Sequence, residues 1–197
     1  MKNAAKTVSD LGCLAGAARN ILVTGLAVDS RAVRPGYLFA ALPGLQVHGA
    51  DYISAALALG ATSILTDAAG VRRARSTLDG AKGICVWISE DPRQALAAAA
   101  ALWFGAQPDT MVAVTGTNGK TSVASFVRQI WTEMGQSAIN LGTNGVLGAW
   151  QAPLTHTTPE PITLHDTLSR AQAAGVTHAA LEASSHGLHQ RRLDGTY

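Results

Sequence analysis

The feature that most constrains this chain is a short apolar strand that runs into a glycine-containing turn and then into a helix. Residues 111–115 read as the strand, and residues 116–121 follow as Gly-Thr-Asn-Gly-Lys-Thr. Glycine lets backbone N–H groups approach phosphate oxygens, and the helix start adds unpaired N–H groups and a positive dipole end. Lys120 adds a mobile positive charge for the β- and γ-phosphates, and the Thr121 hydroxyl can bind Mg²⁺. The segment therefore predicts a nucleoside triphosphate site.

The helix after this turn is predicted by its apolar pattern. Apolar residues recur there at the intervals of one helical face, at Val123, Phe126, Val127, Ile130, Trp131 and Met134. The turn itself departs from the general P-loop spacing, which places a glycine where this chain has Val114. A tight strand-to-helix turn with a surface lysine is the alternative, but it leaves the Gly-Lys-Thr combination unexplained.

Short apolar strands alternate with helices along the chain, which is typical of an α/β fold. Strands are predicted at residues 25–29, 37–42, 63–66, 84–88, 111–115, 137–141 and 178–182. Helices are predicted at residues 51–59, 91–104, 120–134 and 163–174. Asp91-Pro92 supplies an N-cap and a first helical proline. We place a domain boundary before this helix, so that residues 1–89 and 90–197 form separate domains.

Composition excludes several classes of protein. Charged residues make up 14% of the chain and the net charge is +2, which argues against a nucleic-acid partner. Cys13 and Cys85 form no C-x-x-C pair, so we expect two buried, reduced thiols rather than a zinc site. Residues 1–6 lead into no apolar signal-peptide core, and the alanine run near residue 97 is too short to span a membrane. We therefore expect a soluble, cytoplasmic protein with no membrane partner.

Four segments resemble the Mur ligase family. They are T-G-T-N-G-K-T-S at 115–122, V-D-S-R at 28–31 followed by P-G at 35–36 and L-F-A-A-L at 38–42, T-T-P at 157–159, and L-E-A-S-S-H-G-L at 181–188 followed by Gln190 and Arg192. Mur ligases and folylpolyglutamate synthetases share the first segment. The D-S-R segment and E-A-S-S-H-G-L resemble the MurE branch.

The resemblance implies a fold and a set of residue roles. It implies an N-terminal α/β domain at 1–89 that binds the uridine end of a UDP-muramoyl substrate, followed at 90–197 by an incomplete P-loop-type ATPase domain with a mostly parallel sheet. Lys120 and Glu182 would be catalytic, and Thr121 and Glu182 would bind Mg²⁺. The ATP-binding residues would be Gly116, Thr117, Asn118, Gly119, Lys120, Thr121 and Ser122. The substrate-binding residues would be Val28, Ser30, Leu45, Gln46, Val47, Thr157, Thr158, Ser184, Gln190 and Arg192.

The activity implied by the resemblance is ATP-dependent amide formation in peptidoglycan synthesis. The enzyme would convert the D-glutamate carboxylate of UDP-MurNAc-L-Ala-D-Glu to an acyl phosphate, and the amine of meso-diaminopimelate or L-lysine would then displace phosphate. ATP and Mg²⁺ would be the cofactors, and the protein would be a monomer. The family's C-terminal, amino-acid-binding domain has no counterpart here, so we expect the 197 residues alone not to catalyse ligation.

Other interpretations remain open. The chain could derive from a MurF-like ligase, a folylpolyglutamate synthetase, a simple kinase or a non-catalytic nucleotide-binding module. Single residues also have structural explanations. Glu182 could be a solvated strand end, His186 could satisfy a turn, and Thr157-Thr158-Pro159 could be a loop entering a helix. Ser30 could be a turn residue and Arg31 a surface charge, Arg191-Arg192 could be a solvated pair, and Trp103 and Phe104 are expected in the core.

Overall fold

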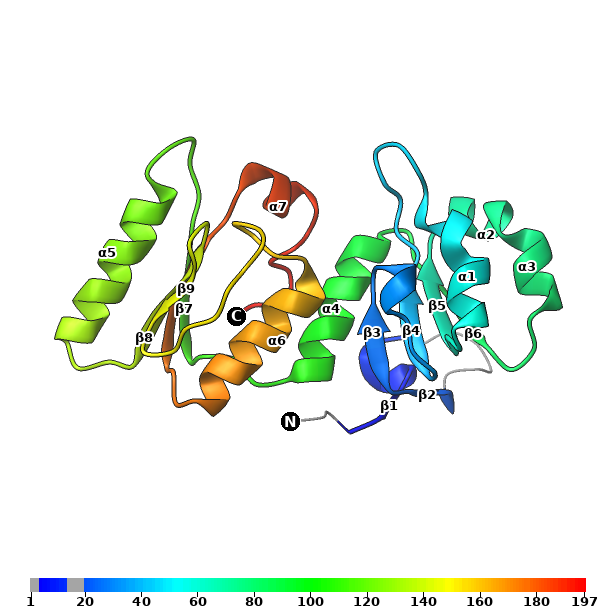
Figure 1. The fold of residues 1–197 in the computed structure, drawn as a ribbon, viewed down its shortest axis with the longest axis horizontal. Helices are drawn as coiled ribbons and strands as arrows, with labels where there is room; N and C mark the ends of the chain where they lie inside the picture. Colours follow the sequence, from blue (N-terminus) through cyan, green and yellow to red (C-terminus); the bar gives the residue numbers. More distant parts are fainter. Residues whose placement is uncertain (1–3, 14–19) are drawn as a thin grey trace. The chain divides into compact units, whose positions relative to one another are not determined.

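The computed structural model describes residues 4–13 and 20–197. By its contacts the chain divides into two compact units, residues 1–103 and 104–197, which are described separately (Figure 1). The helix that begins at Pro92 belongs to the first unit in this division. The sequence pattern placed it in the second domain because a capped helix start resembled a domain start. The assignment of residues 1–89 and 90–197 as functional domains stays a prediction.

The first unit contains a four-stranded parallel sheet in the order β3-β4-β5-β6. Its strands are β3 (Gly25–Ala27), β4 (Tyr37–Ala40), β5 (Ser63–Thr66) and β6 (Cys85–Ile88). A second, antiparallel sheet pairs β1 (Lys6–Thr7) with β2 (Leu22–Val23), and the 3-10 helix η1 (Ser9–Leu11) follows β1. β4 and β5 are buried almost throughout, as expected for central parallel strands covered on both faces.

The first unit has helices where the sequence predicted them, at 51–59 and 91–104, and further short helices that the sequence pattern missed. They are η3 (Ser30–Ala32), η4 (Gly49–Tyr52), α1 (Ile53–Ala58), α2 (Ala68–Arg73), α3 (Arg75–Gly80) and α4 (Pro92–Phe104). Asp91 caps α4 by accepting from Gln94 N at 3.0 Å. Phe39, Ile53 and Ile64 belong to one buried cluster, in which helix α1 packs against the sheet. This core fixes the strand ends that carry the predicted uridine-binding residues.

Several predicted elements of the first unit have other bounds. The strand predicted at 37–42 ends at Ala40, and two further elements change where side chains cap the chain locally. The strand predicted at 25–29 stops at Ala27, since Asp29 accepts from Arg31 N at 2.9 Å and turns the chain into η3. The helix predicted at 51–59 is split into η4 and α1. His48 starts it two residues early by accepting from Ala50 N at 3.0 Å.

The second unit contains a mixed sheet in the order β7-β10-β8-β9. β7 (Thr110–Val114), β10 (His178–Glu182) and β8 (Ala138–Gly142) are parallel, and β9 (Gly145–Gly148) is antiparallel to β8. The helices are α5 (Lys120–Glu133), α6 (Pro161–Ala173) and α7 (Ser185–His189). The α/β class is therefore confirmed. The sequence pattern missed the short, glycine-flanked β9.

Helix α6 closes the core of the second unit. It begins at Pro161, two residues before the predicted start, because the Glu160 carboxylate accepts from the N–H groups of Ile162 and Thr163, each at 2.8 Å. Leu164 and Leu168 are fully buried in one apolar cluster with residues of β8 and β10. This packing holds the carboxyl ends of the parallel strands in place.

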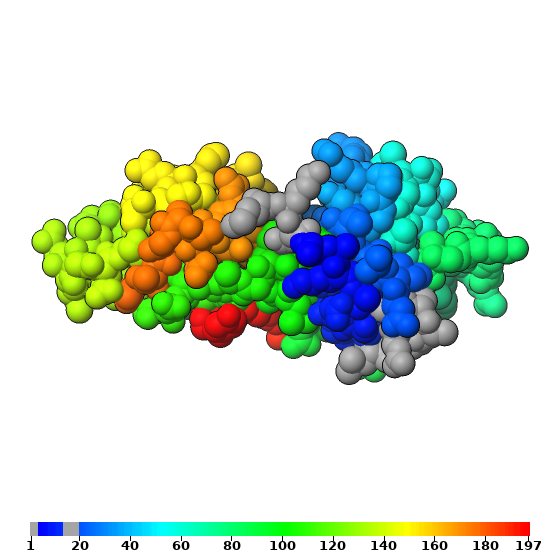
Figure 2. All heavy atoms as spheres, turned by 90° about the horizontal axis from the view of Figure 1, so that it is seen from below, coloured from blue at the N-terminus to red at the C-terminus, as the bar shows by residue number. Residues whose placement is uncertain are grey.

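Helix α5 keeps part of its apolar face in solvent. Ala124 is buried against the sheet, where α5 packs on β8 and β10. The stripe Val123, Phe126, Ile130 and Met134 is exposed, with Phe126 and Ile130 each 59% accessible (α5 is yellow-green in Figure 2). The pattern predicted the helix, but only the half of that face nearest Ala124 packs within the described residues.

Candidate nucleotide and substrate sites

The Gly-Lys-Thr turn joins strand β7 directly to helix α5. Gly119 is the N-cap of α5 and has a φ of +81°, a left-handed conformation that favours glycine. The helix begins at Lys120, whose ammonium donates to the Gly116 carbonyl oxygen at 2.7 Å across the turn. Backbone N–H groups of the helix start and a lysine are thus gathered at one turn, as phosphate binding requires.

Glu182 lies at the carboxyl end of β10, next to this turn. β10 pairs with β7 so that Glu182 is level with Val114, the last residue before the turn. The Glu182 carboxylate is buried, at 2% exposure, and Oε2 accepts from the Thr121 hydroxyl at 2.8 Å. The structure therefore brings together the two residues predicted to bind Mg²⁺. A buried carboxylate that meets a hydroxyl is not the solvated strand end of the alternative interpretation.

Thr143 completes the surroundings of this carboxylate and was missed from the sequence. Its backbone N–H donates to Glu182 Oε1 at 3.1 Å, and its hydroxyl donates to Oε2 at 3.4 Å. The same hydroxyl lies 3.0 Å from that of Thr157, a predicted substrate residue. Thr143 follows the last residue of β8, a parallel neighbour of β10, and that position was the available signal.

Gly142 makes room for the carboxylate. A Cβ atom at this position would lie 1.8 Å from Glu182 Oε1, which is far inside any real contact. The backbone of Gly142 is not in the left-handed region, so its conformation does not require glycine. Glycine is required here because the Glu182 carboxylate approaches so closely that a Cβ atom has no space.

The other predicted substrate residues of the second unit form one network. Thr158 is buried, and its hydroxyl donates to the Glu182 carbonyl oxygen at 2.9 Å and accepts from Ser184 N at 3.0 Å. Ser184 caps α7 by accepting from Gly187 N at 3.0 Å. Arg192 donates to the Thr158 carbonyl oxygen at 2.6 Å and to Gln190 Oε1 at 2.8 and 3.0 Å. The Arg192 guanidinium therefore points toward the protein, which differs from the interpretation of Arg191-Arg192 as a solvated pair.

The predicted uridine residues of the first unit are only partly gathered. A pocket of about 810 Å³ is lined by Val28, Asp29, Ser30, Arg31, Phe39, Leu42, Val47, Gly49, Tyr52 and Ala55. Val28, Ser30 and Val47 were predicted there, whereas Leu45 and Gln46 are exposed beyond its lining. The Arg31 guanidinium, 2.7 Å from Asp29, lowers the pKa of that carboxyl to about 2. The pocket lining therefore combines the charged groups of Asp29 and Arg31 with polar and apolar side chains.

Burial describes several other residues that the sequence singled out. Trp103 is buried, as expected for a core residue, and Phe104 is half-buried. Cys13 and Cys85 are buried and form no disulfide, and burial, with Cys13 nearby, raises the pKa of Cys85 to about 11. His186 is exposed on α7. Among residues 4–13 and 20–197, no helix is both long and apolar enough to cross a membrane.

Comparison with known sequences gives the class of protein that this fold and site define. The profile of the Mur ligase family, catalytic domain, matches residues 22–104, and that of the Mur ligase middle domain matches residues 114–197. The chain belongs to the Mur ligase family.

Within this family, the chain is similar to ligases that carry one name. The chain is 49% identical over 181 residues to a UDP-N-acetylmuramoyl-L-alanyl-D-glutamate--2,6-diaminopimelate ligase of Brucella melitensis biotype 1, covering 91% of the chain and 36% of that protein. It is 49% identical over 183 residues to the ligase of the same name from Rhizobium meliloti, covering 92% of the chain and 36% of the relative. The chain thus spans about a third of the length of these relatives.

Solved structures agree on the fold. A structure of a UDP-N-acetylmuramoyl-L-alanyl-D-glutamate--2,6-diaminopimelate ligase superposes with a TM-score of 0.76 at 28% identity, over 98% of this chain and 38% of the other. A MurF structure from Acinetobacter baumannii matches with a TM-score of 0.59 at 16% identity, over 94% of this chain and 37% of that one, and supports the fold alone.

Proposed function

We propose that the chain supplies the ATP loop and the nucleotide-sugar pocket of a ligase that joins meso-diaminopimelate to UDP-MurNAc-L-Ala-D-Glu. The observation that carries the proposal is the contact between the Thr121 hydroxyl and the buried Glu182 carboxylate beside the Gly-Lys-Thr turn. The names of the relatives at 49% identity support diaminopimelate over L-lysine. The cytoplasmic location and the monomeric state expected from the resemblance belong to the same proposal.

The donor set around Glu182 fits a magnesium ion. Mg²⁺ prefers oxygen ligands, and a hydroxyl and a carboxylate lie within 2.8 Å of each other here. Thr121 and Glu182 would hold the ion, with Thr143 fixing the orientation of the carboxylate. When bound, the ion would offset negative charge on the transferring phosphoryl group.

The chain's own residues would mainly position the reactants. The turn at 116–119 and the first N–H groups of α5 would bind the phosphates, and Lys120 would move from the Gly116 carbonyl to a phosphate oxygen. Thr157, Thr158 and Arg192 would hold the muramoyl-peptide arm, because a guanidinium can bind a carboxylate at two points. The pocket around Ser30 would take the uridine end.

The first test is Glu182→Gln, which keeps the hydrogen-bonding shape and removes the charge. Titration calorimetry with ATP in the presence of Mg²⁺ should show a Kd raised roughly 10- to 100-fold, the usual range when a metal site is disturbed. Without the metal, the affinity for ATP should change little. Equal affinities of wild type and variant for Mg·ATP would refute the assigned role of Glu182.

Binding experiments with different ligands distinguish the proposed function from its rivals. Binding of UDP-MurNAc-L-Ala-D-Glu without binding of folate would support the proposal, and the reverse would support a folylpolyglutamate synthetase. A protein of the relatives' full length that binds ATP tightly without turning it over would be a non-catalytic module. We also expect the 197 residues alone not to form the amide, so that product from the purified chain would contradict this part of the proposal.

A further inference from the structure

Two backbone hydrogen bonds hold the loop between β4 and η4, one at its base and one across its tip. Gly49 N donates to the Leu42 carbonyl oxygen at 2.8 Å, and Gly44 N donates to the Val47 carbonyl oxygen at 3.1 Å. Between these bonds the loop presents apolar side chains to solvent, with Leu45 at 95% and Val47 at 56% exposure. Val47 also lines the pocket of the first unit. Such a loop needs anchors, because exposed apolar side chains do not themselves fix its shape.

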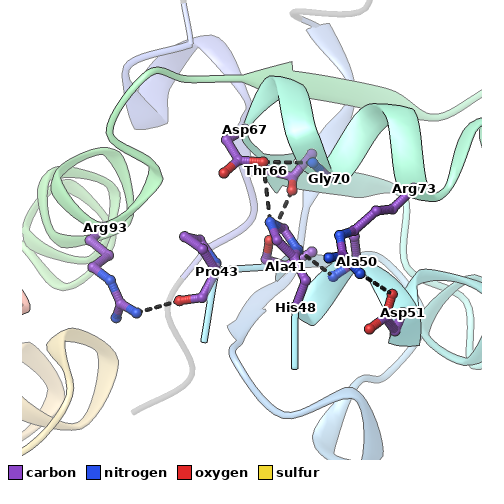
Figure 3. A network of polar contacts seen from close by, with 10 residues as sticks. All are labelled: Ala41, Pro43, His48, Ala50, Asp51, Thr66, Asp67, Gly70, Arg73 and Arg93. Carbon is purple, nitrogen blue, oxygen red and sulfur yellow. Dashed lines mark hydrogen bonds and ion pairs between the residues drawn. The ribbon is translucent and has the colours of Figure 1, made fainter. Parts of the chain in front are cut away.

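His48 is the anchor at the end of this loop (Figure 3). The ring is buried, at 8% exposure, and Nδ1 accepts from Ala50 N at 3.0 Å. In the neutral ring the proton is therefore on Nε2. Nε2 lies 3.2 Å from Asp67 Oδ1, to which it donates. One side chain thus caps η4 and ties the loop to the residue that follows β5.

Asp67 extends the connection to helix α2. Its Oδ1 also accepts from Gly70 N at 2.6 Å, so the carboxylate is the N-cap of α2. A Cβ atom at Gly70 would lie 2.0 Å from Thr66 Oγ1 and 2.9 Å from His48 Cε1, so the ring fills the space beside this glycine. The His48 ring is therefore fixed by packing as well as by hydrogen bonds.

The other end of the loop has its own contact. Arg93 of α4 donates to the Pro43 carbonyl oxygen, and Pro43 forms a β-bridge with His48 (Figure 3). The loop is thus fixed at both ends, while residues 44–47 project from it. An anchored backbone with free apolar side chains is the arrangement of a preorganised binding loop.

We infer that His48 and Asp67 are positioning residues, which hold residues 44–47 in the conformation that receives the uridine end of the substrate. The inference rests on the function proposed for the first unit. A clamp of this kind raises affinity because the loop does not have to be ordered on binding. His48 and Asp67 are not among the residues that line the pocket, so they act through the loop rather than by contact with the ligand.

The experiment uses two variants that each remove the contact between His48 and Asp67 but keep a helix cap. In His48→Asn the amide oxygen can still accept from Ala50 N, yet the side chain is too short to reach Asp67. In Asp67→Ser the hydroxyl can still cap α2 but does not reach His48. Asp67→Asn serves as the conservative variant, since its amide oxygen can accept both bonds. Asp79→Ser, which breaks an exposed ion pair with Arg75 in α3, is the matched control.

Two measurements are made on the 197-residue chain. The first is amide hydrogen exchange of residues 44–49 without ligand, and the second is the Kd for UDP by titration calorimetry. His48→Asn and Asp67→Ser should each speed loop exchange and raise the Kd about tenfold, as expected if the competent loop is populated about a tenth of the time. The double variant should be no worse than either single one. Asp67→Asn and Asp79→Ser should resemble wild type, and Kd values for ATP should be unchanged throughout.

The outcomes separate the clamp from the proposed function. Unchanged exchange of residues 44–49 in His48→Asn would refute the clamp, whatever the protein binds. Faster exchange with an unchanged Kd for UDP would refute the positioning role and leave a structural one. Failure of the wild type to bind UDP would overturn the proposed function of the pocket, and with it the role of the clamp in binding. Weaker binding by both variants, with restoration in Asp67→Asn, supports the inference.

Discussion

Gly142→Ala is the sharpest test of how the phosphate turn and Glu182 are fitted together. The new Cβ atom would lie 1.8 Å from Glu182 Oε1, 2.3 Å from Cδ and 2.6 Å from Cγ. These atoms belong to the carboxylate arm itself, so the side chain must leave its place or β8 must shift. Leaving breaks the contacts with the Thr121 hydroxyl, the Thr143 N–H and the Thr143 hydroxyl.

The magnitude follows from these contacts. If the side chain leaves, three hydrogen bonds of roughly 1 kcal/mol each are lost, and if β8 shifts instead, overpacking costs about 1–3 kcal/mol; in either case the free energy of unfolding should fall by about 1–3 kcal/mol. The Kd for Mg·ATP should rise about 10- to 100-fold, because an oxygen ligand has moved. The Kd for ATP without metal should stay close to that of wild type, since the turn and Lys120 are untouched.

Urea unfolding gives the stability, and titration calorimetry with and without Mg²⁺ gives the affinities. Gly80→Ala is the matched control, because a Cβ atom there meets nothing within 4 Å. That variant should keep wild-type affinities and gain up to about 1 kcal/mol of stability, as is usual for a helical glycine. If Gly142→Ala bound Mg·ATP within twofold of wild type, the claim that Glu182 needs its present position would be refuted.

Two further predictions concern stability alone. The pKa of Asp29 is lowered from 3.8 to about 2, so its contact with Arg31 contributes stability above pH 4 that is lost as the pH falls toward 2. In Asp29→Asn the free energy of unfolding, measured with urea, should fall less between pH 4 and pH 2 than it does in wild type. The difference should be less than about 1 kcal/mol because both side chains are exposed. A larger fall in the variant than in wild type would contradict this. On α5, Phe126→Ser should change unfolding stability by about 0.5 kcal/mol or less, whereas Ala124→Leu should cost about 1–3 kcal/mol. Equal losses in these two variants would show that the exposed stripe packs in solution.

Local signals in the sequence predicted the strands of both parallel arrays and four helical regions, but not the short elements α2, α3, β9 and α7. Strand β5 has the predicted bounds, and helix α4 has the predicted Asp91 cap. Both predictions succeeded because an apolar run and an Asp-Pro helix start are signals contained within a few consecutive residues. In three segments the bounds differ because a side chain changes the local geometry. Asp29 shortens β3, His48 starts η4 early, and Glu160 starts α6 early.

The residues of the candidate site also fall into two groups, those predicted from one local segment and those whose place depends on strand pairing. Lys120 and Thr121 were predicted from the Gly-Lys-Thr combination and from its place between a strand and a helix, which are contiguous in the sequence. The role of Glu182 came from a family resemblance, and its place beside the turn depends on the pairing of β10 with β7. Thr143 was missed because it is 39 residues away from Glu182 in the sequence. The two residues meet only because the parallel strands β8 and β10 end at the same edge of the sheet.

The sequence by itself was enough to predict the phosphate-binding residues, since all of them lie in one continuous segment. The tertiary structure alone decided that Gly142 leaves space for a carboxylate and that Thr158, Ser184 and Arg192 share one network. It also decided that Val123, Phe126, Ile130 and Met134 of the apolar face of α5 stay exposed. The physical reason is that strand order and close packing join residues far apart in the chain, and no periodicity of the sequence encodes which strands become neighbours.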